Sequence, residues 1–163
     1  MLGVDPGSTV TGFGIVEVTD GTLKAVAYGA IKTAGLNPFP KKLERIFNSI
    51  GELITSRDFT TLAIEFPFHH KNFKTALRLG QAQGVVILAA AVHGLPVAQY
   101  APAEIKQAVV GYGGGSKEQV AFMVRRILSL PDEPMALDTT DALAVAVCHA
   151  NHHRMQQRLG AHL

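Results

Sequence analysis

The sequence predicts a single α/β domain, built on a mixed five-stranded sheet that is flanked by helices. Two observations carry this prediction. Residues 2–32 contain three strand patterns separated by short turns, as in an antiparallel meander. From residue 43 onward, amphipathic helices alternate with two short apolar strands, as in sheets that helices cover. With 163 residues, of which 47% are hydrophobic and 17% charged, the chain fits one globular domain.

The first three strands are expected at residues 2–6, 11–18 and 22–32. The first is an apolar run that ends in Asp5, and the Pro-Gly pair that follows favours a turn. Gly21 lies in the turn between the second and third strands. This part of the chain should therefore fold back on itself twice.

Strands and helices then alternate. Apolar residues recur at helical spacing over residues 43–54, and the short apolar strand at residues 61–65 again ends in a carboxylate, Glu65. Residues 72–93 predict a helix that is apolar on more than one face in its C-terminal half, so it is either central or covered by a partner chain.

The last third of the chain predicts a fifth strand at residues 96–100 and three helices. Pro102 suits the first turn of a short helix that reaches Val110. Ser116 and Gln119 form a capping-box pair that begins the next helix. The final helix should run over residues 137–157, with residues 155–163 as a polar C-terminal tail of the same domain. The resulting order, β-β-β-α-β-α-β-α-α-α, is that of the ribonuclease H-like fold.

Composition favours a cytoplasmic protein. The formal net charge is only +2, so the overall charge is a weak argument for nucleic-acid binding. Cys148 is the only cysteine and cannot form an internal disulfide. The longest apolar run, residues 85–92, is too short to span a membrane, and no basic-then-apolar leader precedes the first strand. We expect no membrane partner.

Four acids are candidates for one metal site. Asp138 and Asp141 lie three apart on the final helix, which places both carboxylates on one face. Taken alone, they could simply favour the positive end of the helix dipole. However, Asp5 and Glu65 end two apolar strands that can meet at one edge of the sheet, and the final helix must pack on that sheet. Clustered carboxylates suit Mg²⁺ or Mn²⁺, and a pair of such ions is the usual arrangement for attack on a phosphodiester.

Several segments together resemble one family, the RuvC Holliday junction resolvases. The resemblance covers nearly the whole chain and keeps the family's order and spacing. The segments that carry it are Leu2-Gly3-Val4-Asp5-Pro6-Gly7-Ser8 with Thr11-Gly12, Ala63-Ile64-Glu65, Leu79-Gly80-Gln81-Ala82-Gln83-Gly84, Lys106-Gln107-Ala108-Val109-Val110-Gly111 and Asp138-Thr139-Thr140-Asp141-Ala142-Leu143-Ala144.

The resemblance implies a metal-dependent endonuclease that cuts four-way DNA junctions by symmetric paired incisions, leaving 5′-phosphate and 3′-hydroxyl ends. Such an enzyme acts in homologous recombination and DNA repair. The implied catalytic metal ligands are Asp5, Glu65, Asp138 and Asp141, holding two Mg²⁺ ions for which Mn²⁺ can substitute. The family also implies a homodimer and a partnership with the RuvA–RuvB branch-migration complex.

Five further residues are candidates for contacts with DNA. By resemblance, Lys106 and Lys117 lie near the scissile phosphate, and Phe68 packs against bases at the junction centre. Lys71 and Lys74 are further candidates for phosphate contacts. Each lysine alone would more often be an ordinary surface residue. Phe68 could be a core residue, although its Pro- and His-rich loop favours exposure.

The chain departs from the family pattern at three positions. Phe66 stands where the family usually has Gln, so a polar contact beside the acids is in doubt. Thr139 and Thr140 replace smaller residues, which alters the packing or adds a hydroxyl next to the site.

Two other patterns are weaker. His149 and His153 have the i, i+4 spacing of metal ligands, with His152 between them, but solvated surface is the favoured interpretation. Residues 111–117 resemble a phosphate-binding loop, yet Glu118 stands where such a loop needs Ser or Thr.

Two alternative functions remain at this stage. A nucleotide phosphohydrolase of the actin-like class also opens with a strand, an acid and a glycine turn, but it needs a second related domain that 163 residues cannot supply. A non-catalytic junction-binding protein on the same fold would not need all four acids.

Overall fold

Five strands form one mixed sheet in the computed structural model, which describes residues 1–66 and 72–160. The strand order across the sheet is β3-β2-β1-β4-β5. β1 pairs with β2 in antiparallel and with β4 in parallel, and β5 continues the parallel half beside β4. The strands are β1 (Leu2–Asp5), β2 (Val10–Thr19), β3 (Thr22–Lys32), β4 (Leu62–Glu65) and β5 (Val97–Tyr100). The predicted sheet is confirmed.

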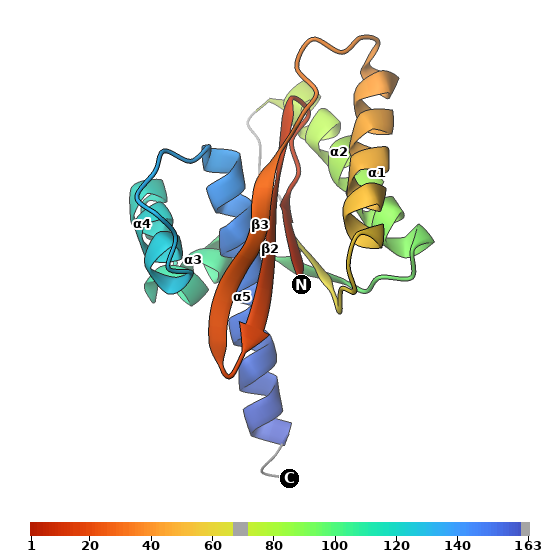
Figure 1. The fold of residues 1–163 in the computed structure, drawn as a ribbon. Helices are drawn as coiled ribbons and strands as arrows, with labels where there is room; N and C mark the ends of the chain where they lie inside the picture. The colour runs from red at the N-terminus through yellow and green to blue at the C-terminus, as the bar shows by residue number, and fades with distance from the viewer. Residues whose placement is uncertain (67–71, 161–163) are drawn as a thin grey trace.

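Helices cover both faces of this sheet (Figure 1). α1 and α2 pack on one face, and α3, α4 and α5 pack on the other. Their bounds are α1 (Phe39–Thr55), α2 (Phe73–Val92), α3 (Pro102–Val110), α4 (Lys117–Ile127) and α5 (Leu137–Gly160).

Two helix boundaries differ from the expectation. α1 begins at Phe39, four residues before the apolar pattern, because the fixed φ of Pro40 suits a first helical turn. α5 continues to Gly160, beyond the expected end at residue 157. The first six residues of the expected polar tail, 155–160, are therefore helical.

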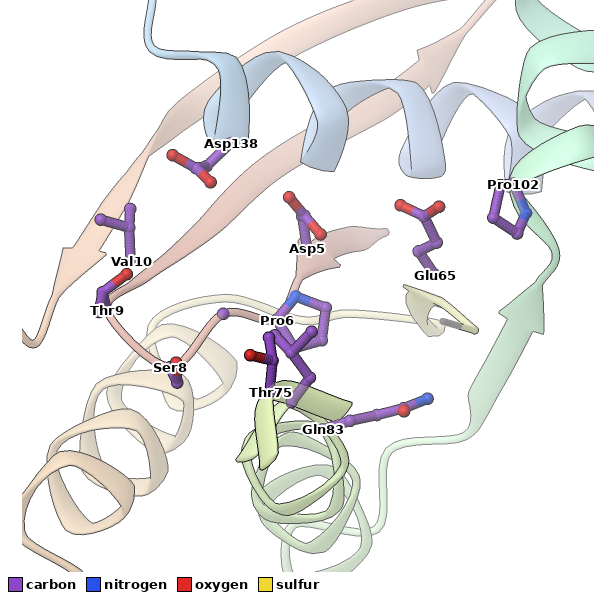
Figure 2. A pocket seen from close by; sticks show the side chains of 12 residues that line it. Asp5, Pro6, Ser8, Thr9, Val10, Glu65, Thr75, Gln83, Pro102 and Asp138 are labelled. Atoms are coloured by element: carbon purple, nitrogen blue, oxygen red, sulfur yellow. The ribbon is translucent and has the colours of Figure 1, made fainter. Parts of the chain in front are cut away.

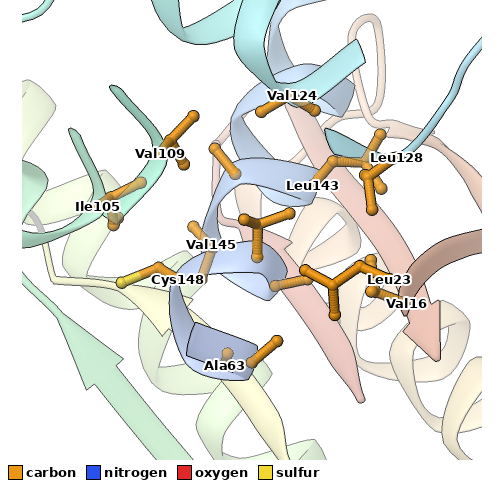
Figure 3. Close-up of a cluster of buried hydrophobic side chains, with 14 of the residues drawn as sticks. Val16, Leu23, Ala63, Ile105, Val109, Val124, Leu128, Leu143, Val145 and Cys148 are labelled. Atoms are coloured by element: carbon orange, nitrogen blue, oxygen red, sulfur yellow. The ribbon is translucent and has the colours of Figure 1, made fainter. Parts of the chain in front are cut away.

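The core has one layer on each side of the sheet. The layer under α3, α4 and α5 is shown in Figure 3, where Leu143 and Val145 of α5 meet Val16 of β2 and Val124 of α4. The other layer joins α1 and α2 to the strands through Ile46, Ile50 and Val86, among others. Each helix buries an apolar side in one of these two layers, and the hydrophobic effect thereby holds the helices on the sheet.

α5 lies unusually close to β1 and β2, and glycine makes this approach possible. A Cβ on Gly12 would overlap the backbone carbonyl of Asp138, and one on Gly3 would overlap the carbonyl of Ala142. A Cβ on Gly14 would lie 2.6 Å from Cδ2 of Leu143. The first turns of α5 therefore rest directly on strand backbone, without an intervening layer of side chains.

α2 has two apolar sides. Val86, Ala89 and Ala90 are buried, whereas Leu77 and Leu88 are exposed on another side of the same helix. By length and composition alone, α2 is the one helix among those described that could cross a membrane, with a mean hydropathy of 1.4. This single match is weak evidence, because a helix that packs on the core of a soluble domain passes the same test.

We predict that Gly12→Ala destabilises the fold by about 2 kcal/mol or more, since backbone that must move to admit a methyl group costs about 1–3 kcal/mol in a packed core. Unfolding in urea measures this loss. Gly114→Ala is the matched control, because a Cβ there meets only ordinary contacts of 3.7 Å or more, and it should change stability by less than about 0.5 kcal/mol. Equal stability of the two variants would contradict the close packing of α5.

Candidate functional site

Four carboxylates gather at one edge of the sheet. Figure 2 shows three of them, Asp5, Glu65 and Asp138. Asp5 is the last residue of β1 and Glu65 is the last residue of β4. The two strands are parallel neighbours in register, with Val4 opposite Ile64, so their carboxyl ends lie side by side. A strand that ends in an acid directs that acid to the sheet edge, where water or a ligand can reach it.

α5 brings the other two acids. Asp138 lies in its first turn, above Gly12, and Asp141 follows on the same face. Both carboxylates influence Asp5 electrostatically, which places them around the same opening. The structure thus brings together the four acids that the sequence singled out.

The two threonines between these aspartates face away from the acids. The Thr139 hydroxyl donates a hydrogen bond to the carbonyl of Gly29 on β3 at 3.1 Å, and the Thr140 hydroxyl donates one to the carbonyl of Ala136 at 3.3 Å. Both side chains are buried. Of the two effects expected for these residues, the structure therefore supports packing, since their hydroxyls fasten the start of α5.

Burial and neighbouring negative charges raise the pKa values of two of these carboxylates. Burial, followed by the charges of Asp141, Glu65 and Asp138, raises the pKa of Asp5 to about 7, although Lys117 opposes this. The pKa of Glu65 is also raised, first by burial and then by Asp141, while Lys117 and Lys106 lower it. Nearby cations therefore offset only part of the negative charge at this edge.

Two cavities adjoin at the acids. The larger, of about 460 Å³, is lined by Asp5, Glu65 and Asp138 together with the β1–β2 turn and α2. The smaller, of about 190 Å³, is lined by Asp141 and two lysines. Glu65 and Pro102 line both cavities, so they mark the border between them.

Lys106 and Lys117 both line the smaller cavity. Nζ of Lys117 lies 3.2 Å from Oδ2 of Asp141, and this carboxylate raises the pKa of the lysine. Lys117 begins α4, whose start is fixed by the predicted capping box of Ser116 and Gln119. Lys117 thus stays charged beside Asp141, as a site for a phosphodiester requires.

The donor set fits a hard divalent cation. All four candidate ligands are carboxylates, and oxygen is the donor that Mg²⁺ and Mn²⁺ prefer. Within residues 1–66 and 72–160, no three His, Cys, Asp or Glu side chains are already arranged to hold one ion. A cation bound here would favour the ionised forms of Asp5 and Glu65, against the burial and the neighbouring carboxylates that raise their pKa values.

The remaining candidates are distributed differently. Lys74 is exposed in the first turn of α2, whereas Phe68 and Lys71 lie outside the described residues. Phe66 is exposed, and its backbone N–H donates to the carbonyl of Tyr100. It therefore extends the pairing of β4 with β5 and presents no polar side chain there.

The favoured interpretation of the histidines as solvated surface is wrong for His149. Its Nδ1 lies 2.7 Å from the hydroxyl of Tyr100, and burial lowers the pKa of its ring. His152 is half-buried beside the same tyrosine, and only His153 is exposed. α5 carries these residues to the far end of the sheet, away from the acids.

The wall of the larger cavity that faces the acids was not predicted from the sequence. Thr75, Leu79 and Gln83 of α2 form part of it, together with Ser8 and Thr9 of the β1–β2 turn. The available signal was the spacing of four between the α2 residues, which aligns them on one face of a helix.

Comparisons with known proteins agree with this geometry. The sequence model of a family described as crossover junction endodeoxyribonuclease RuvC matches residues 1–149. A crossover junction endodeoxyribonuclease RuvC of Moorella thermoacetica is 49% identical over 159 residues, which are 97% of this chain and 95% of the relative.

Two solved structures are also similar over most of their length. Thermus thermophilus RuvC superposes with a TM-score of 0.87 at 35% identity, covering 96% of this chain and 97% of that one. T. thermophilus RuvC in complex with a Holliday junction substrate gives a TM-score of 0.90 at 35% identity, covering 95% of this chain and 94% of that one.

In the absence of metal ions, we predict that Asp5→Asn raises the melting temperature at pH 8 by about 3 °C or more. The folded pKa of about 7 exceeds the ordinary value of 3.8, so the contribution of Asp5 to wild-type stability falls as pH rises from about 4 to about 7 and is then constant. The advantage of the variant should grow over that range and vanish near pH 4.

Melting curves in EDTA from pH 4 to pH 9 test this expectation. Asp58→Asn serves as the control, because Asp58 is exposed and precedes β4 at the opposite edge of the sheet. A difference between Asp5→Asn and wild type that is the same at pH 4 and pH 8 would overturn the electrostatic account.

Proposed function

The chain belongs to the RuvC family of crossover junction endodeoxyribonucleases, enzymes that resolve Holliday junctions, and we propose that its four clustered carboxylates are the metal-binding catalytic groups. The observation that carries the proposal is the convergence of Asp5, Glu65, Asp138 and Asp141 at one sheet edge, beside two lysines. Neither alternative function fits this combination of family and site.

The proposed ions are two Mg²⁺ per site, for which Mn²⁺ can substitute. When bound, such ions polarise the phosphodiester and lower the pKa of a coordinated water. Asp5 is the central ligand, because its pKa responds to each of the other three acids. Cation binding would counteract the burial and the like charges that raise the pKa values of Asp5 and Glu65.

The two lysines are proposed to bind the scissile phosphate rather than the metal ions. Lys106 and Lys117 line the smaller cavity and would neutralise the phosphate oxygens of the scissile strand. The water oxygen bonds to phosphorus as the bond to the 3′ oxygen breaks, which leaves 5′-phosphate and 3′-hydroxyl ends. The protein contributes position and charge rather than a covalent nucleophile.

Residues at and before the start of α2 are proposed to contact the DNA. Lys74 lies at the start of α2, which also borders the larger cavity, and it is proposed to contact phosphate together with Lys71. Phe68, between Glu65 and α2 in the chain, is proposed to stack on bases exposed at the junction centre. The resemblance further suggests the RuvA–RuvB complex as a partner and the cytoplasm as the location.

Paired incision requires two sites that face opposite strands, and we assign the interface to α2. Its exposed side carries Phe73, Leu77, Leu88 and Val92, spaced so that they share one face. A single apolar stripe on both copies suits an isologous two-fold contact. The predicted homodimer thus accounts for the second apolar side of α2.

We predict that Asp138→Asn and Asp141→Asn each fold and bind four-way junctions but lose Mg²⁺-dependent nicking. The expected loss is about 10²–10³-fold or more, the scale of removing one electrostatic group from an active site. Junction affinity should be equal or tighter, since a negative charge near the DNA backbone is gone. Nicking, junction affinity and melting temperature are measured for each variant.

Asp132→Asn is the control for both variants, because Asp132 is exposed and pairs only with Arg125 among the described residues. It should cut at the wild-type rate. Near-normal nicking by Asp138→Asn or Asp141→Asn would remove that residue from the set of catalytic ligands.

We also predict that Leu88→Glu converts the dimer to a monomer, because a charge on each copy would face its symmetry mate in a desolvated contact. Sedimentation velocity at micromolar concentration measures the change. Phe122→Glu on α4 is the matched control, since Phe122 is 57% exposed and Leu88 53%. A Leu88→Glu protein that remains dimeric would place the interface elsewhere.

A further inference from the structure

Gln83 is a buried polar residue that the catalytic chemistry does not use. It belongs to α2, is only 7% exposed and lines the larger cavity on the wall opposite the acids. In Figure 2 its amide points along the cavity toward the side where Glu65 and Pro102 lie. A long polar side chain is seldom buried to this degree without a partner for its amide.

The cavity offers a place for the partner of this amide. Within the described residues no side-chain hydrogen bond engages Gln83, and the residue lines the larger cavity. A ligand in the cavity can therefore approach the amide nitrogen and oxygen. A fixed donor and a fixed acceptor, side by side on a rigid helix, are thus presented to whatever enters.

We propose that the larger cavity receives the base of the nucleotide next to the scissile phosphate, and that Gln83 hydrogen-bonds the edge of that base. Gln83 is then a specificity-determining residue. This inference rests on the proposed function, because it takes the scissile phosphate to lie at the acids.

The division between the two cavities supports a base rather than a phosphate. Lys106 and Lys117 both line the smaller cavity, and among the described residues no cation lines the larger one. Apart from the acids, the described part of its lining is neutral, with hydroxyls from Ser8, Thr9 and Thr75 and apolar surface from Pro6, Val10 and Leu79. A neutral wall with one amide suits a flat heterocycle, whose edge offers donors and acceptors together.

Size and continuity agree with this assignment. The volume of about 460 Å³ falls within the range of about 300–1,000 Å³ that is typical of small-molecule sites. Glu65 and Pro102 border both cavities, so a strand with its phosphate beside Glu65 can place its next base in the larger cavity. One nucleotide would then span the border.

Single-turnover cleavage of four-way junctions tests the proposal. The junctions differ only in the base on either side of the incision, and Mg²⁺ is saturating. Wild type should cut the best and worst bases at one of these positions with rates about 5- to 100-fold apart. Gln83→Met, which keeps the volume but removes the donor and acceptor, should reduce that ratio to below about threefold while junction affinity is unchanged.

Gln156→Met makes the same chemical change on the exposed end of α5 and should keep the wild-type ratio. Wild-type rates within about twofold for all bases would overturn the inference, as would a Gln83→Met protein that slows every junction equally. The second of these results is expected of a merely structural glutamine. Failure of wild type to cut any junction would instead overturn the proposed function.

A second measurement covers the case in which Gln83→Met does not fold. Wild type is given the best junction with one base-edge group removed by a nucleobase analogue at the preferred position. A loss of about 5-fold or more for at least one analogue supports the contact. Equal cutting of all analogues overturns it.

Discussion

The packing of α5 directly on the backbone of β1 and β2 is the contact on which the catalytic edge depends. A side chain at Gly12 or Gly3 would lift the helix off the strands, because helix carbonyls lie where a Cβ would be. The same contact sets the position of Asp138 relative to Asp5, the last residue of β1. Packing and chemistry thus depend on the same few residues. The buried hydroxyl of Thr139 on α5 donates a hydrogen bond to the carbonyl of Gly29 on β3, which holds the helix in the same position.

Holding four carboxylates together carries an energetic cost. Burial and three like charges raise the pKa of Asp5 to about 7, so ionisation of Asp5 lowers the stability of the protein without metal. A site of this kind stores repulsion that a divalent cation relieves, and the binding free energy of the cation then includes that relief.

The parts of the site that follow strand and helix periodicity could be predicted from the sequence. An acid at the end of an apolar strand and two acids three apart on a helix have positions that the backbone dictates, so Asp5, Glu65 and the α5 pair could be expected to meet. Gln83 could not be assigned in this way, because a glutamine on a helix is ordinarily solvated and only the tertiary packing of α2 buries it. The bond between Tyr100 and His149 was missed for the same reason, since its partners lie 49 residues apart.

α2 links the proposed interface to the proposed specificity. The buried side of this helix packs against α1 and the sheet and, toward the start of the helix, carries Thr75, Leu79 and Gln83 into the cavity, whereas the opposite side presents Leu77 and Leu88 to solvent. A partner seated on the exposed side would therefore press α2 against the sheet. Dimerisation would then restrict the position of Gln83 relative to the acids.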